Sequence, residues 1–372
     1  VCDVCAVPGG KATGLLQQLN HTGYLVANEV IKSRLHVLNS ALERTGLGNY
    51  VTTSLDVAQF SELLPSRFDC VLVDAPCSGQ SMVGSHKQSI AAYSEHQIHH
   101  SAARQRRILQ AASRLAKPGG RLVYSTCTFA VVENEETIQH FLSLNSDWRT
   151  VEYSDLQPWG SPLLSGCYRL WPHRDDCDGA FVAILARNAD GSVQLSDSPA
   201  ISLPSDYTFA NRIGKRDEFA SKVSFNKLRL WRGKMTQLDF LNYERSELVG
   251  YSIWQFRDRL LSILDLIPRT LLPYLVSAPT IAKYHTERIV PEYFSAVAIK
   301  PSLKPNLKLE LSSQQAIRYL SGESIHLDAH PPFQGWCRAE WSGRQIAWGK
   351  LLGNQLKNHL PKSLRQPNLV AN

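Results

Sequence analysis

Residues 68–79 read FDCVLVDAPCSG, an apolar run that ends in an acid, a proline and a cysteine. A short apolar run bounded by turn residues is typical of a buried strand, and a helical pattern follows it from about residue 94 to 115. The next apolar run, residues 121–125, leads into Thr126 and Cys127 in the same way. Strands that alternate with helices predict a parallel sheet with helices on its faces.

The same alternation extends over the rest of the first half of the chain. Further strands are predicted at residues 1–5, 24–27, 50–53 and 181–185, and further helices at residues 12–19, at 31–44 and from about 133. We therefore predict an α/β, Rossmann-like domain over residues 1–188. In such a sheet, ligands bind at the carboxyl ends of the strands, where the strand order reverses.

After residue 188 the sequence changes in character. Residues 189–204 are polar and rich in turn residues, so we predict a linker there. Residues 205–372 combine short strand patterns with scattered prolines and many Trp and Tyr residues.

The composition is that of a globular protein. Of the 372 residues, 43% are hydrophobic, enough to bury a substantial core. No apolar run is long enough to cross a bilayer, and the amino terminus lacks the segments of a signal peptide. The eight cysteines are irregularly spaced, which favours free thiols in a reducing compartment. We therefore expect a cytoplasmic protein and, by default, a monomer.

Charge is distributed unevenly along the chain. Residues 1–189 hold 16 Lys+Arg and 17 Asp+Glu, whereas residues 190–372 hold 24 and 16, so the basic excess lies in the second half. Such an asymmetry suggests contact with a polyanion, and nucleic acid is the expected one in the cytoplasm. An ordinary solvated basic surface would explain the charge equally well.

The spacing of Cys2 and Cys5 matches one half of a metal site. In a strand, however, residues an odd number apart point to opposite faces, and no partner CxxC or Cys/His cluster completes the site. We therefore expect no metal.

Glycines and acids follow the first three predicted strands. The first turn, residues 5–11, reads CAVPGGK; its glycines let a ligand approach the backbone, but it lacks the GxGxxG and GxxxxGK[ST] patterns of nucleotide-binding loops. Glu29 is placed to accept hydrogen bonds from ribose hydroxyls, and Asp56 from an adenine amino group. Each acid alone could be a loop or cap residue, but the set at successive strand ends predicts a nucleoside site that S-adenosylmethionine fits.

Two cysteines follow the next two strands, Cys77 in DAPCSG and Cys127 in STCTF. Methylation of cytosine at C5 needs such groups, because C5 is a poor nucleophile until a thiolate adds at C6, and a second acid/base group helps release the product. If strands four and five are neighbours, the two thiols face each other, and Asp74 can bind the exocyclic amine of the base. A free cysteine is usually a small core residue, which explains Cys70 better than it explains two cysteines in polar turns.

Together these segments resemble the RNA cytosine-5 methyltransferases of the Nol/Nop/Sun family. The matching stretches are DVCAVPGGK, ANE with the following Ser33-Arg34, VLVDAPCSG, KPGGRLVYSTCTF with ENEE, and WPHRDDCDGAF, which span the chain from Val1 to about Arg187. The resemblance implies a class I methyltransferase domain with Cys127 as nucleophile and Cys77 assisting release. It implies that S-adenosylmethionine is bound by Cys5, Ala6, Val7, Pro8, Gly9, Gly10, Lys11, Glu29, Asp56 and Asp74. Both cysteines together favour RNA over DNA, since the DNA enzymes use the cysteine of their Pro-Cys motif as nucleophile.

The last part of the chain resembles the PUA-like RNA-binding module of bacterial enzymes that modify a cytosine in small-subunit ribosomal RNA. The stretches YLSGESI and GWCRAEWSGRQIAWGKLLGNQLKNHLPKSLR carry this likeness. It implies an intermediate domain at 205–290, a smaller mixed α+β or β-barrel PUA-like domain at 291–372, and 16S rRNA rather than tRNA as the partner. Trp336, Trp341 and Trp348 lie among basic residues and suit base stacking, although we expect at least two of the three in a β-barrel core.

Two features depart from the family pattern. The chain begins without a methionine inside the first predicted strand, where relatives have a preceding RNA-binding region, so it resembles a fragment lacking that part. After DAPCSG the family usually shows a basic pair followed by an acid and a proline, whereas this chain has Gly84, Ser85, His86 and Lys87. The altered loop puts the grip on substrate there in doubt.

Alternative functions remain open at the level of sequence. A tRNA cytosine-5 methyltransferase would use the same chemistry, and a non-catalytic RNA-binding or ribosome-assembly factor could retain the same motifs. An amino-group methyltransferase is the weakest alternative, because attack by nitrogen needs no thiol and the strand-four motif is DAPC rather than an Asp/Asn-Pro-Pro-aromatic turn.

Overall fold

The computed structural model describes residues 1–82, 93–189, 228–230, 251–256, 258–285, 288–298 and 308–367. The predicted linker, apart from Ala189, and the loop from Gly84 to Lys87 lie outside these residues. The described chain forms three sheets.

The first sheet contains the strands of the first half of the chain. Across the sheet they run β3 (Tyr50–Thr53), β2 (Leu25–Asn28), β1 (Cys2–Asp3), β4 (Phe68–Asp74), β5 (Ala116–Thr126), β8 (Ala180–Arg187) and β6 (Trp148–Thr150), with β7 (Cys167–Leu170) also paired to β8. β1 is parallel to β2 and β4, and β4 is parallel to β5. β8 is antiparallel to β5, β6 and β7. The predicted α/β, Rossmann-like fold is confirmed, but the sheet is mixed rather than parallel throughout.

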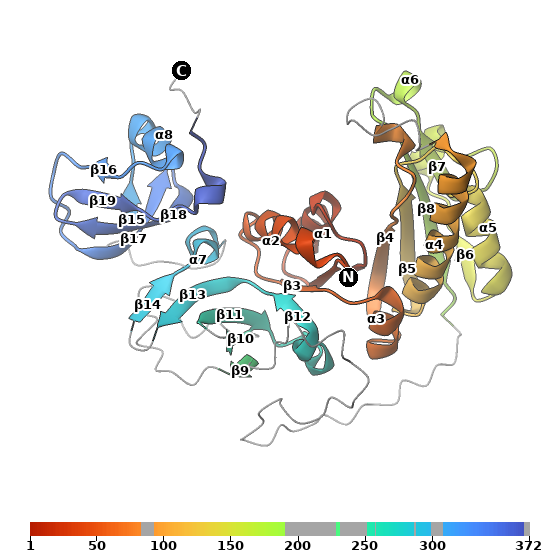
Figure 1. Ribbon diagram of the computed structural model, residues 1–372, viewed down its shortest axis with the longest axis horizontal. Coiled ribbons are helices and arrows are strands. Elements are labelled where there is room, and N and C mark those ends of the chain that lie inside the picture. The colour runs from red at the N-terminus through yellow and green to blue at the C-terminus, as the bar shows by residue number, and fades with distance from the viewer. Residues whose placement is uncertain are drawn as a thin grey trace. The chain divides into compact units, whose positions relative to one another are not determined.

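Six helices of this part of the described chain connect the strands. They are α1 (Gly10–Leu19), α2 (Leu35–Glu43), α3 (Val57–Leu63), α4 (Glu95–Ser113), α5 (Glu135–Leu144) and α6 (Pro172–Asp175). α4 packs against α3, α5, β4 and β5, and Figure 1 shows α4 and α5 side by side along the sheet. No helix in the described parts of the chain is both apolar and long enough to cross a membrane.

The centre of the first sheet is buried on both faces. Val71, Val73, Leu122, Tyr124 and Phe181 are each fully buried, as expected for strands covered by helices. Full burial of such side chains stabilises the fold by roughly 1.5–3 kcal/mol each. β1 lies between β2 and β4, so the strand order reverses beside it. The carboxyl ends of β1 and β4 therefore border the crevice where ligands bind in this class of sheet.

Several elements differ from the sequence-based prediction. β5 begins at Ala116, five residues before the strand predicted at residues 121–125, and its pairing register with β4 shifts between Phe68 and Cys70. β1 is shorter than predicted, since Val4 already belongs to the following turn. α3, β6, β7 and α6 were not predicted; they span only three to seven residues.

The second half of the chain contributes two five-stranded sheets. One consists of β14 (Arg288–Pro291), β13 (Thr280–His285), β11 (Arg259–Leu264), β10 (Tyr251–Phe256) and β9 (Leu228–Leu230), and β12 (Leu275–Ser277) and α7 (Tyr293–Val297) occur in the same stretch. The other consists of β15 (Lys308–Glu310), β17 (Gly335–Trp341), β18 (Arg344–Leu352), β19 (Gln355–Asn358) and β16 (Ile325–His326), with α8 (Ser313–Ser321) between β15 and β16. This α+β arrangement agrees with the predicted PUA-like region.

The three tryptophans of this last sheet have different environments. Trp348 is 1% exposed within a hydrophobic core, and its Nε1 donates to Ser295 Oγ at 2.9 Å. Trp336 packs against the same core, whereas Trp341 is 38% exposed. Two of the three thus pack in a hydrophobic core, as expected, but this core is formed with residues between Ile253 and Ala298 rather than within the last sheet alone.

Candidate active site

A cavity of about 1030 Å³ opens at the carboxyl ends of the strands, a volume close to the upper limit typical of small-molecule sites. Nine of the predicted site residues line it: Cys5, Val7, Pro8, Lys11, Glu29, Asp56, Asp74, Cys77 and Cys127. Of the remaining three, Ala6 and Gly9 are buried and Gly10 is exposed at the start of α1, and none of them lines the cavity. The strand-end rule therefore predicted which residues meet at this edge of the sheet.

The turn after β1 is held by a buried acid that the sequence analysis did not single out. Asp3 is fully buried, and its Oδ1 accepts from the Cys5 amide at 3.2 Å. Burial raises the pKa of Asp3 to about 7. Further along the turn, Gly9 has a φ of 116°, which favours glycine, and its carbonyl accepts from the Thr13 amide in α1 at 2.8 Å. The turn thus passes directly into the helix.

Two acids follow β2 and β3 on one side of the cavity. Glu29 is 5% exposed; one oxygen accepts from the Ile31 amide at 2.8 Å, and the other lies 3.7 Å from the guanidinium of Arg34. Asp56 is exposed and is the N-cap of α3, accepting from the Ala58 amide at 2.9 Å. The cap accounts for one interaction of Asp56, and its position in the cavity wall leaves the carboxylate available to a ligand as well.

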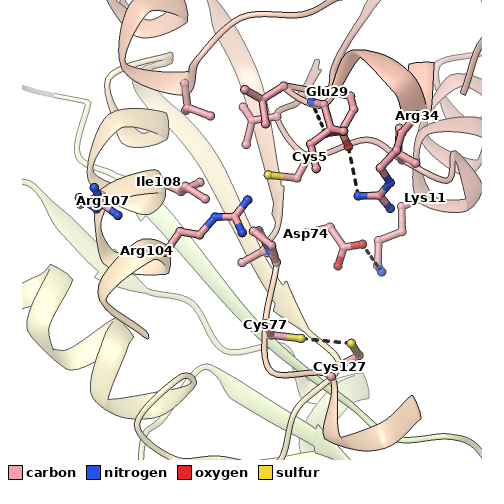
Figure 2. Close-up of a pocket in the computed structure, with 18 of the residues that line it drawn as sticks. Cys5, Lys11, Glu29, Arg34, Asp74, Cys77, Arg104, Arg107, Ile108 and Cys127 are labelled. Carbon is pink, nitrogen blue, oxygen red and sulfur yellow. Dashed lines mark hydrogen bonds and ion pairs between the residues drawn. The ribbon is translucent and has the colours of Figure 1, made fainter. Parts of the chain in front are cut away.

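Asp74, the last residue of β4, stands between this region and the cysteines. Its Oδ2 forms an ion pair with Lys11 Nζ at 2.8 Å, and its Oδ1 accepts from Ser125 Oγ at 2.7 Å. Figure 2 shows Asp74 and Lys11 between the labelled Cys5 and the two cysteines. Each carboxylate oxygen keeps a second lone pair, so Asp74 can accept a hydrogen bond from a ligand amine.

The thiols of Cys77 and Cys127 meet at the edge of the cavity. Their Sγ atoms are 3.1 Å apart, on the turns after the neighbouring strands β4 and β5 (Figure 2). The hydrogen bond from Cys77 lowers the pKa of Cys127 to about 7, with a further contribution from Ser81, against the opposing effect of burial. The same hydrogen bond, followed by burial, raises the pKa of Cys77. The pair is therefore polarised: Cys127 carries the thiolate and Cys77 holds the proton.

The sequence analysis missed the contribution of α4. Arg104, Arg107 and Ile108 also line the cavity, and Figure 2 shows Arg104 extending towards Asp74. Their spacing along α4 places them on one helix face, which is the signal that could have identified them. In the described residues no group of three or more His, Cys, Asp or Glu side chains is arranged to hold a metal ion.

Comparison with known proteins assigns the first half of the chain and part of the second half. The family described as "16S rRNA methyltransferase RsmB/F" matches residues 1–186, and the "Methyltransferase RsmF PUA domain" matches residues 306–366. Ribosomal RNA small subunit methyltransferase F of Psychromonas ingrahamii is 26% identical over 99% of this chain and 74% of its own length. The protein of the same name from Shewanella loihica is 29% identical over 99% of this chain and 73% of its own.

A shorter match is closer in sequence. Ribosomal RNA small subunit methyltransferase F of Aeromonas salmonicida is 38% identical over 50% of this chain and 40% of its own length. Among solved structures, that of NSun6 from Pyrococcus horikoshii with SFG is 29% identical over 50% of this chain and 47% of its own, with a TM-score of 0.44. The chain belongs to the RsmB/F family of S-adenosylmethionine-dependent 16S rRNA methyltransferases, and it carries the PUA domain of the RsmF type.

Proposed function

We propose that this enzyme methylates C5 of a cytosine in 16S rRNA through a covalent bond between Cys127 and C6, and that Cys77 assists release of the product. The observation that carries the proposal is the pair of thiols, whose sulfurs lie 3.1 Å apart at the edge of the cavity. Transfer to a nitrogen or a ribose oxygen has no use for a nucleophilic thiolate, whereas transfer to C5 depends on one.

The cavity residues suit S-adenosylmethionine. Glu29 and Asp56 offer carboxylates for the ribose hydroxyls and the adenine amine, and Ile31, Val57 and Ile108 supply apolar surface in the same cavity. The charged methionine end can reach Lys11 and the turn at Cys5. When bound, the cofactor would supply an electrophilic methyl group, whose bond to the sulfonium sulfur breaks on transfer and leaves a neutral thioether.

Cys127 and Asp74 act on the base. The Cys127 thiolate adds to C6, so the S–C6 bond forms and the electron pair of the C5–C6 double bond becomes available at C5 for bonding to the methyl group. Removal of the C5 proton then restores the double bond and breaks the S–C6 bond, which returns Cys127 as a thiolate and releases one proton. Asp74 accepts a hydrogen bond from the exocyclic amine of the cytosine and so holds the ring in position for attack by Cys127.

Cys77 acts at the release step. While Cys127 is an anion, the hydrogen bond to it raises the pKa of Cys77 and keeps that thiol protonated. Once Cys127 is bonded to C6 it is no longer an anion, so this cause disappears and Cys77 ionises more readily. Cys77 can then accept a proton at the step that frees Cys127.

Substitution of the two cysteines tests the proposal. We expect Cys127→Ala to abolish incorporation of labelled methyl groups into 16S rRNA while binding of S-adenosylmethionine, measured by calorimetry, is retained. We expect Cys77→Ala to accumulate a covalent protein–RNA adduct that survives denaturing electrophoresis. Cys177→Ala is the matched control, because Cys177 is an exposed free thiol outside the cavity lining. Wild-type activity in Cys127→Ala, or incorporation into tRNA alone, would contradict the proposal.

A further inference from the structure

The turns that carry the two cysteines contact each other through matching pairs of side chains. Cys77 and Cys127 are each followed by a hydroxyl residue, and Ser78 Oγ and Thr128 Oγ1 lie 2.9 Å apart. Behind them, the Ala75 amide donates to the Ser125 carbonyl at 2.8 Å. The sulfur pair is therefore one of several contacts that join the turns after β4 and β5.

A buried carboxylate, that of Glu133, accepts hydrogen bonds from both turns. Glu133 is 0% exposed. Its Oε2 accepts from the Ser78 amide at 2.9 Å and from Gln105 Nε2 at 2.8 Å, and its Oε1 accepts from Ser78 Oγ at 2.5 Å and Thr128 Oγ1 at 3.2 Å. Among the described residues these partners are all neutral donors. The carboxylate thus binds both cysteine turns and α4 at once.

Stability of the fold alone does not account for a buried carboxylate at position 133. A buried carboxylate loses its hydration, and hydrogen bonds with neutral donors must replace it. Its position instead gives it a geometric effect: the donors on Ser78 and Thr128 converge on it, so each turn is held next to its cysteine. The hydrogen bond between the sulfurs, which lowers the Cys127 pKa, depends on the distance that these turns set.

We propose that Glu133 is a positioning residue for methyl transfer, which sets the distance between the sulfurs of Cys77 and Cys127 through the two turns that carry them. The carboxylate does not line the cavity and touches no reacting atom; it acts through the two turns. The consequence for methyl transfer rests on the proposed function, whereas the effect on the thiols does not need RNA.

The test is Glu133→Gln in the full chain, with two thiol readouts. The amide keeps the size of the side chain but has one acceptor oxygen in place of two, so it replaces only part of the hydrogen bonding by which the carboxylate holds the two turns together. We expect the midpoint of the pH profile for iodoacetamide alkylation of Cys127 to move upward from about 7, with alkylation at pH 7 slowed roughly tenfold. We expect disulfide formation between Cys77 and Cys127 with diamide, which takes up both thiol hydrogens, to slow by a similar factor.

Glu135→Gln is the matched control. Glu135 is also buried and lies two residues away, but its partners are Arg169 and Ser161 rather than the cysteine turns. This variant should lose thermal stability and keep the wild-type alkylation profile and cross-linking rate. The positioning role is wrong if Glu133→Gln also keeps the wild-type alkylation profile and cross-linking rate. It is equally wrong if Glu133→Gln and Glu135→Gln change these two readouts by the same factor.

A second variant keeps the inference testable if the Glu133→Gln protein does not fold. Thr128→Val removes one donor to the carboxylate with little change in shape and should shift both readouts in the same direction by a smaller factor; unchanged readouts in it would also overturn the inference. The outcome is separable from the proposed function. If Cys77→Ala does not accumulate a covalent RNA adduct, the methylation mechanism is wrong, but the alkylation and cross-linking results for Glu133→Gln still stand.

Discussion

At the scale of single residues, the pKa of Cys127 is lowered and that of its neighbour Cys77 is raised, which makes the reaction pH-dependent. Cys127 is reactive as a thiolate, and its pKa of about 7 means that half of it is protonated at that pH. The single-turnover rate at saturating RNA and cofactor should therefore rise with pH through about 7 and level off above about 8. In Cys77→Ala, the midpoint for formation of the RNA adduct should lie at higher pH. A rate that is flat between pH 6 and 8 would show that Cys127 ionisation does not limit the reaction.

The buried Asp3 links stability to pH. Its folded-state pKa is raised to about 7, above the ordinary 3.8, so the folded state favours the neutral acid. The stability that this group contributes is fully present below about pH 4 and is lost as pH rises through 7. Asp3→Asn should therefore stabilise the protein at pH 8, on the order of 2 kcal/mol, and have little effect at pH 4 to 5.

Thermal unfolding of wild type and Asp3→Asn at pH 4.5 and pH 8 measures this difference. The amide keeps the acceptor for the Cys5 backbone N–H, and its NH2 group takes the place of the buried Oδ2, which has no hydrogen-bond partner, much as the OH of the neutral acid does. An equal gain at both pH values would mean that the effect of the substitution does not come from ionisation.

At the scale of elements, a buried ion pair joins β7 to α5. Arg169 of β7 and Glu135 of α5 have side chains 7% and 1% exposed and form a bidentate contact, and Arg169 also donates to the Phe129 carbonyl at 3.1 Å. Removing one partner leaves a buried charge, so Arg169→Met should lower the free energy of unfolding by about 3–5 kcal/mol. The double variant with Glu135→Leu should recover much of that loss in urea denaturation. If the double variant is no more stable than Arg169→Met, the orphaned charge is not the cause.

The elements show what the sequence predicts well. The strand at 50–53 was predicted at its observed bounds because all four residues are buried and read as one run. β6 and β7 were missed because WRT and CYRL are short and carry an arginine each. α3 was missed because it spans only seven residues; a cap role for Asp56 was considered, but no helix was predicted after it. In the structure Asp56 is the N-cap of α3 and also lines the cavity.

The candidate site was predictable wherever a strand end marks it. Glu29, Asp56, Asp74, Cys77 and Cys127 all follow apolar runs, and parallel strands bring such ends together. Residues that act from elsewhere gave no such signal. Asp3 lies within a strand and Glu133 reaches the turns from a loop, so only the three-dimensional arrangement reveals them. Arg104 faces the cavity from α4, and its helical spacing from Arg107 and Ile108 is the one signal that the sequence offers for it.

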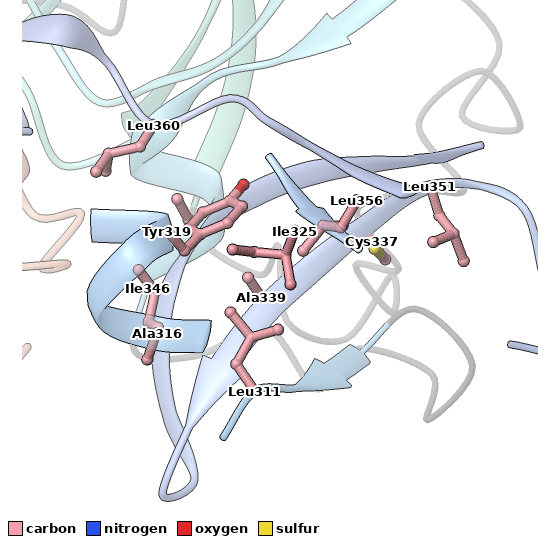
Figure 3. Close-up of a cluster of buried hydrophobic side chains, with 11 residues drawn as sticks. Leu311, Ala316, Tyr319, Ile325, Cys337, Ala339, Ile346, Leu351, Leu356 and Leu360 are labelled. Carbon is pink, nitrogen blue, oxygen red and sulfur yellow. The ribbon is translucent and has the colours of Figure 1, made fainter. Parts of the chain in front are cut away.

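At the scale of the whole molecule, the positive charge is concentrated in the second half. One face of the last sheet is covered by α8 and buries Cys337, Leu351 and Leu356 (Figure 3). Lys350 pairs with Lys357 across β18 and β19, and the alternation of side chains puts both on the opposite face. These two cations should therefore contribute to the attraction for RNA.

We expect RNA affinity of the full chain to fall by roughly tenfold or more between 50 and 200 mM salt, as counterions compete for the phosphates. The double substitution Lys350→Gln and Lys357→Gln should weaken this dependence in filter-binding titrations. Lys117→Gln is the control, because Lys117 is already paired with Asp69 at 2.7 Å in the first domain. An unchanged salt slope in the double variant would place the RNA contacts elsewhere.

The position of the sulfur pair also restricts the RNA that the enzyme can modify. Under the proposed mechanism, Cys127 has to approach C6 perpendicular to the plane of the cytosine, and within a helix that face is covered by the adjacent base. Because the thiols line the cavity on turns of two neighbouring strands, a cytosine has to enter the cavity to meet them. The nucleotide must therefore swing out of its stack before chemistry begins, at the expense of a few kcal/mol. Cytosines that are already extruded, as in loops of unfolded or partly assembled ribosomal RNA, should be methylated fastest.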